Sequence, residues 1–63
     1  MNKYQIAAQQ NVDQHLGDVV DGDDDVTVIM DEAFSLAYDG AIGAGADPNT
    51  ATAIASSIAN TVF

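Results

Sequence analysis

The stretch Val26–Ala41, VTVIMDEAFSLAYDGA, decides the fold expected for this chain. The β-branched start VTVIM alone favours a strand. The apolar positions of the whole stretch nevertheless recur at spacings of three and four, which places them on one face of a helix. We therefore predict a helix over residues 24–41, with Asp23 or Asp24 as its N-cap and the three glycines of segment 40–45 at its end. The apolar positions are Val26, Ile29, Met30, Ala33, Phe34, Ala37, Tyr38 and Ala41.

Two further segments have helical periodicity. The first predicts a helix at about residues 2–16, since its apolar residues gather on one side. The second begins with Asp47-Pro48, an N-cap followed by proline at the first helical position, where its missing N–H costs nothing. It predicts a helix over residues 48–61. The two apolar stripes are Tyr4, Ala8, Val12, Leu16 and Val19, and Ala51, Ile54, Ala55, Ile58, Ala59 and Val62.

Packing the three stripes together gives an all-α three-helix bundle, a single acidic domain of residues 1–63. Alanine is the commonest apolar residue, so the core is expected to be thin, with Phe63 available to close one end. The chain has no cysteine, which excludes a disulfide framework and a thiolate metal site. A core this small can be completed by a second copy, so a homodimer stays open.

Net charge is the outlying property of the sequence. Ten acidic residues face a single Lys3, giving a formal charge of −9. The negative field makes nucleic acid and anionic membrane poor direct partners, and it favours a basic protein surface, a cation or a high-salt environment. No signal peptide and no membrane span are visible, so we expect a soluble, cytoplasmic protein, located in the host cytoplasm if it is phage-encoded. No cofactor is indicated.

The acidic residues form the candidate partner-binding site. Nine of the ten acids are Asp, although Asp is the poorer helix former, and no cation is interspersed among those of segment 21–39. On the predicted helix, Asp25, Glu32 and Asp39 form one stripe with neighbours about 10 Å apart, and Asp24 and Asp31 form a second row. A negatively charged ridge of this kind is able to occupy a basic groove that normally holds DNA. The residues expected to bind a partner are Asp21, Asp23, Asp24, Asp25, Asp31, Glu32 and Asp39.

A small, cysteine-free, strongly acidic and alanine-rich helical chain resembles the phage-encoded DNA-mimic inhibitors, above all the anti-CRISPR proteins. The resemblance covers size and charge, without a shared motif. It implies a CRISPR effector as the target and its basic DNA- or PAM-binding groove as the blocked surface. A type I effector complex, which reads a duplex PAM with exposed cations, fits this description. The chain would then act as an inhibitor by protein–protein interaction.

Two other classes stay open. Segment 21–32 resembles an EF-hand or dockerin calcium loop, with Asp21, Asp23, Asp25 and Glu32 as metal ligands. However, position 6 of that frame is Val26, where the chain needs a residue that turns at positive φ. Acids with little lysine are also typical of a small structural protein of a halophile or a virion.

An enzyme is not expected. His15 is the only histidine, and its place near the edge of the apolar face predicts a partly buried structural residue. The serines therefore have no evident base.

Overall fold

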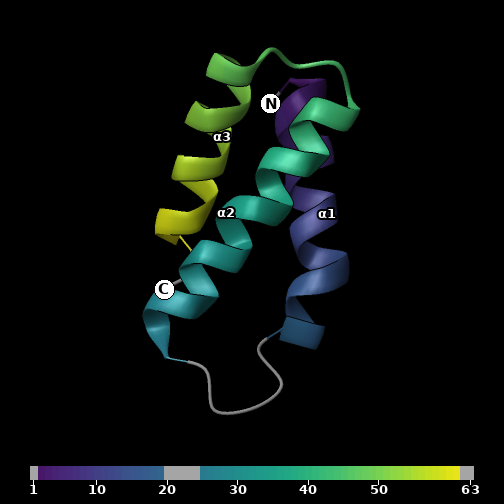
Figure 1. The fold of residues 1–63 in the computed structure, drawn as a ribbon. Coiled ribbons are helices and arrows are strands. Elements are labelled where there is room, and N and C mark those ends of the chain that lie inside the picture. Colours follow the sequence, from purple (N-terminus) through teal and green to yellow (C-terminus); the bar gives the residue numbers. More distant parts are fainter. Residues whose placement is uncertain (1, 20–24, 62–63) are drawn as a thin grey trace.

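The protein consists of three helices, and the expected all-α three-helix bundle is confirmed. The computed structural model describes residues 2–19 and 25–61. Helix α1 spans Lys3–Val19, α2 spans Val26–Gly43 and α3 spans Pro48–Thr61. They run alternately down, up and down the bundle, so each helix is antiparallel to the next (Figure 1).

Helix α2 holds the bundle together. It packs extensively against both α1 and α3, whereas α1 and α3 touch each other only sparingly. In Figure 1, α2 runs obliquely between the two outer helices. The arrangement is therefore a pair of helix interfaces that share α2, with an open side between α1 and α3.

The core is built mainly from alanine. Eight of its eleven buried apolar residues are alanines, and no large side chain is completely buried among the described residues. On α2 and on α3 the buried alanines follow each other at intervals of four, which forms a smooth stripe along each helix. Small side chains between packed helices allow the two axes to approach closely. The buried alanines of these two helices are Ala33, Ala37 and Ala41, and Ala51, Ala55 and Ala59.

The start of α2 differs from the expectation. Asp25 is the N-cap, since its carboxylate accepts a hydrogen bond of 2.9 Å from the backbone N–H of Val28. Asp23 or Asp24 was expected to cap this helix, and both lie outside the described residues. Val26 was expected in the core but is 52% exposed, because it lies in the first turn, where the described parts of α1 and α3 do not cover it.

The end of α2 also lies further along the chain than expected. The helix continues through Gly40 to Gly43, and the chain turns at Gly45, where φ is +104°. Gly40 lies inside the helix and does not end it. Its missing side chain allows α2 to lie close to the backbone of α1. A Cβ atom at this position would lie 2.7 Å from the carbonyl oxygen of Ala7 and 2.9 Å from the Cα of Ala8.

The outer helices agree more closely with the sequence. Helix α1 continues three residues beyond the expected end, through Gly17 to Val19, and buries Ala8 and Val12. The side chains of Leu16 and Val19 lie outside the described part, as do Val62 and Phe63. Helix α3 has the expected bounds and buries all of its predicted stripe except the half-buried Ile58 and the undescribed Val62.

Asp47 precedes α3 and caps it as predicted. Its backbone carbonyl accepts a hydrogen bond of 2.9 Å from the N–H of Ala51. A hydrogen bond from the side chain of Thr50, assisted by the backbone N–H groups of Asn49 and Thr50, lowers the pKa of Asp47 below its ordinary value. The first turn of α3 is therefore stabilised by an ionised carboxylate.

Replacing Gly40 with alanine should destabilise the fold. Because the new methyl group would meet backbone atoms of α1 that cannot rotate away, we expect a loss of about 1–3 kcal/mol of unfolding free energy, measured by thermal or urea denaturation. Gly17→Ala is the matched control, since its Cβ meets nothing within 4 Å and alanine is the better helix former. Equal effects of both substitutions would contradict the close approach at Gly40.

Replacing Asp47 with alanine should lower the melting temperature at neutral pH, and the part of the loss that is due to the charge should disappear in acid. The folded pKa of Asp47 lies below its unfolded value of about 3.9, so its contribution is present above that pH and is lost as the pH falls through the lowered folded value. Asp47→Asn keeps a neutral cap, so its stability relative to Asp47→Ala should not change with pH. A pH-independent deficit of Asp47→Ala against the native protein would contradict this assignment.

Candidate partner-binding surface

The described carboxylates of segment 25–39 are all exposed. Asp31, Glu32 and Asp39 project from α2, and Asp25 lies at its start. Asp25 precedes the helix as its cap, so the expected three-member stripe is reduced within α2 to Glu32 and Asp39, which are about 10 Å apart along the axis. The remaining predicted site residues, Asp21, Asp23 and Asp24, lie outside the described residues.

The outward face of α2 has an uncharged centre between its acids. Val28, Ser35 and Ile42 follow each other at intervals of seven and so lie above one another on the exposed side. Val28 is 42% exposed and Ile42 is 39% exposed. Asp31 lies on one side of this line, and Glu32 and Asp39 lie on the other. The described acids are exposed as the sequence predicted, whereas the exposed aliphatic residues Val28 and Ile42 were not predicted, although their spacing of fourteen residues places them on one face.

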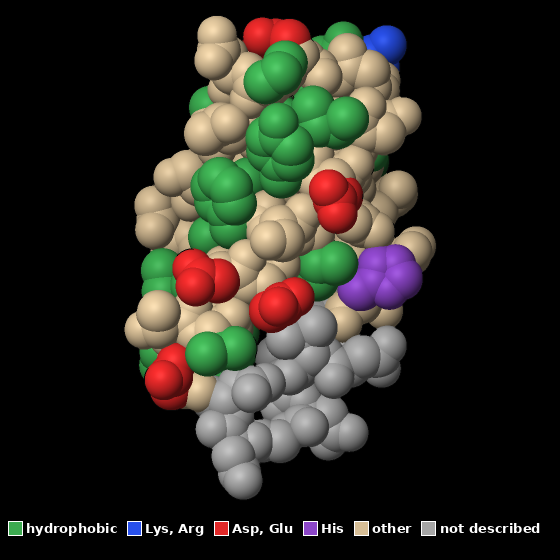
Figure 2. Space-filling model, viewed as in Figure 1, with side chains coloured by type: hydrophobic (Ala, Val, Ile, Leu, Met, Phe, Trp, Pro, Cys, Tyr) green, Lys and Arg blue, Asp and Glu red, His purple; other side chains and the backbone are tan. Residues whose placement is uncertain are grey.

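Two aromatic side chains border this face on the side of Asp31. The rings of Phe34 and Tyr38 stack at 15° to each other with centroids 6.5 Å apart. Both were expected in the core, and both are half-buried at its edge. Together with Ser35 and Asp39 they line a shallow depression on α2. Figure 2 shows hydrophobic and carboxylate side chains interspersed over this side of the molecule.

No lysine or arginine offsets the acids of α2. The sequence contains only Lys3, whose ammonium group lies 5.3 Å from the centre of the Tyr4 ring, a cation–π interaction at the start of α1. Asp31, Glu32 and Asp39 therefore face solvent on a helix that carries no basic residue of its own. An exposed face with unbalanced charge attracts a surface of opposite sign.

The side of α2 next to α1 forms a polar groove. Its lining includes Gln10, Gln14, His15 and Asp39 together with Gly40 and Gly43. The expectation of a partly buried His15 is wrong, because this side chain is exposed where it lines the groove.

Asn11 is a polar residue of α1 that takes part in the packing against α2. It is half-buried where α1 meets α2, and its Nδ2 donates a hydrogen bond of 2.7 Å to the backbone carbonyl of Leu36. Asn11 is thus part of the helix interface and is not a free polar group of the groove.

The calcium-loop hypothesis depends on residues that the structure describes only in part. Helix α2 begins at Val26, position 6 of the loop frame, so Glu32 lies six residues into a helix. The carboxylate of Asp25 already accepts the N–H of Val28. Within residues 2–19 and 25–61, no group of three or more His, Asp or Glu side chains is placed to hold a metal ion. Asp21 and Asp23 lie outside these ranges.

Comparisons with known proteins add no assignment. No protein-family model, no curated protein and no solved structure matches this chain. None of the three described helices combines the length and the hydropathy needed to cross a membrane. The chemistry of the surface therefore carries the functional argument.

Calcium should stabilise the protein no more than magnesium does. The described acids of α2 are spread along the helix, so both ions act mainly by screening repulsion. We expect equal melting temperatures in about 1 mM of either ion, measured by circular dichroism with the ionic strength held constant. A rise specific to calcium would restore the calcium-module hypothesis, because selective binding to the native state stabilises it by mass action.

Proposed function

We propose that this protein binds through the outward face of α2 to a basic, nucleic-acid-binding surface of another protein and thereby excludes the nucleic acid. One observation carries the proposal: exposed carboxylates flank exposed aliphatic side chains on a helix without any cation. A face that only maintains solubility mixes acidic with basic residues and has few exposed aliphatic side chains. The face of α2 has the opposite composition.

The spacing of the charges determines what kind of mimic this is. Duplex DNA presents about one charge per 1.7 Å of its axis, whereas Glu32 and Asp39 are separated by about 10 Å. The helix therefore reproduces the negative field of DNA but not its charge density. Burial of Val28 and Ile42, bordered by the Phe34–Tyr38 pair, supplies the remaining affinity, since burial of apolar surface is the main favourable term in protein association.

The class of target follows from size and charge. A chain of 63 residues with a net charge of −9 resembles the phage-encoded anti-CRISPR inhibitors, and the basic PAM-binding groove of a CRISPR effector is a surface of the required sign. We propose such an effector, with a type I complex as the first to test. The proposed partner-binding residues within the described chain are Asp25, Asp31, Glu32 and Asp39; Asp21, Asp23 and Asp24 extend the same acidic segment along the sequence.

Neutralising the acids of α2 should abolish this activity. The test variant carries Asp31→Asn, Glu32→Gln and Asp39→Asn, all at exposed positions, so the fold should persist. The readout is displacement of a labelled PAM duplex from purified type I effector complexes, followed by fluorescence anisotropy. We expect the concentration needed for displacement to rise at least about 100-fold, since each of the removed charges contributes roughly 1 kcal/mol or more to the binding free energy.

The matched control separates charge position from net charge. Thr52→Lys, Ser56→Lys and Asn60→Lys change the net charge by the same three units on the exposed side of α3. This variant should displace the duplex as the native protein does, and added salt should weaken displacement. Equal loss in both variants, or a ternary complex that retains the duplex, would show that the acids do not form a docking face.

A further inference from the structure

The groove between α3 and α1 has no charged residue in its lining. Helix α3 contains no Asp, Glu, Lys or Arg in its fourteen residues. The groove has a volume of about 170 Å³ and is lined by Gln5, Gln9, Ile54, Ser57, Ile58 and Thr61. The nearest carboxylate along α1 is Asp13, which accepts a hydrogen bond of 2.9 Å from Gln9. In a chain with a net charge of −9, a groove lined only by uncharged residues differs in charge from the acidic face of α2.

We propose that this groove is the interface of a symmetric homodimer, with the same groove of a second copy as its occupant. Two identical acidic chains repel each other through their α2 faces, so they are able to associate closely only where carboxylates are absent. The proposal goes beyond the binding of a basic partner, because it concerns a different face and a different occupant.

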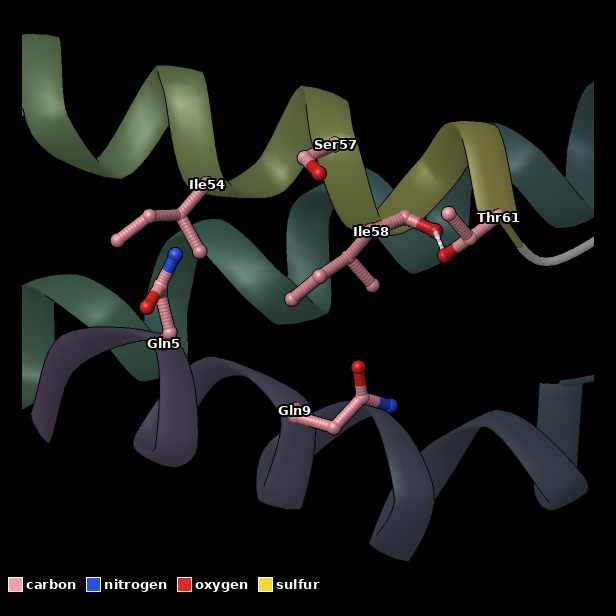
Figure 3. A pocket seen from close by; sticks show the side chains of 6 residues that line it. All are labelled: Gln5, Gln9, Ile54, Ser57, Ile58 and Thr61. Carbon is pink, nitrogen blue, oxygen red and sulfur yellow. Dashed lines mark hydrogen bonds between the residues drawn. The ribbon is translucent and has the colours of Figure 1, made fainter. Parts of the chain in front are cut away.

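The polar groups of the groove suit a partner of the same sequence. The Gln5 side-chain oxygen accepts the N–H of Asn2, and the Gln9 side-chain nitrogen donates to Asp13. These two bonds do not use the side-chain nitrogen of Gln5 or the side-chain oxygen of Gln9. Both atoms are directed toward α3 (Figure 3). A twofold interface requires self-complementary chemistry. This groove offers one donor and one acceptor on α1, flanked by isoleucines that pack equally well against themselves.

Size and stability support the same occupant. A standard interface takes about 800 Å² from each partner, about one fifth of the 3873 Å² of accessible surface of this chain. One of the three long sides of a three-helix bundle is large enough to supply that area. Small domains with a thin core gain stability from disulfides, metals or oligomerisation. The sequence has no cysteine, and a second copy that covers the half-buried Ile58 would enlarge the core around the buried Ile54.

Neighbouring serines provide a matched test. Ser56 and Ser57 are both exposed on α3, and only Ser57 lines the groove. Each is replaced by Asp, and the dimer dissociation constant is measured by sedimentation equilibrium at low and high salt. We expect Ser57→Asp to raise the constant at least about tenfold, because two new like charges meet in the interface. Ser56→Asp should behave as the native protein. A native protein that stays monomeric, or equal effects of both variants, would overturn the proposal.

Methyl NMR tests the face directly on the native chain. On dilution, the methyl signals of Ile54 and Ile58 should shift, while that of Ile42 on the α2 face should not. Shifts at Ile42 alone would place the interface elsewhere and overturn the proposal. Salt distinguishes this association from the binding proposed above: screening should tighten the dimer and weaken the docking on a basic surface. Each proposal can therefore fail without the other.

Discussion

The close packing of three helices through alanine and glycine is the constraint on which the rest of the structure depends. With eight alanines among the eleven buried apolar residues of the described part, there is little apolar volume to hold the helices together. Stability must come from many short-range interactions between closely spaced backbones. Gly40, which lies against the backbone of α1, marks such a close approach. Helix α2 therefore occupies the centre, and its outward face is left free for charge.

Periodicity predicted the existence of all three helices because it reports which positions share a face, whatever the local propensity. It gave the bounds of α3 but not the ends of α1 and α2. In the sequence Gly40 is typical of a glycine that ends a helix. In the structure its missing side chain instead allows α2 to lie close to α1. The β-branched start of α2 became helical because Asp25 caps it. His15 was misplaced because a sequence does not give the angle between α1 and α2.

The charged residues of the candidate site could be predicted from the sequence. Asp31, Glu32 and Asp39 are exposed as expected, since three ionised groups without cations are stable only in water. The exposed aliphatic residues Val28 and Ile42 were not predicted as part of the site, because they lie outside the periodic apolar stripe and were given no role. The uncharged character of α3 is visible in the sequence, but its meaning depends on the groove that α3 forms with α1.

The close approach of Gly40 to α1 has a consequence for the uniqueness of the fold. Alanines spaced by four make an interface that is nearly unchanged when one helix slides along its neighbour by a turn of about 5.4 Å. Apolar packing alone would then tolerate several registers of similar free energy. Gly40 distinguishes among them, because a shift of α2 by one turn would bring Leu36 or Ala44 to its place, where a Cβ atom meets backbone atoms of Ala7 and Ala8. In a core with so few distinctive shapes, one missing side chain specifies the alignment that the alanines leave undetermined.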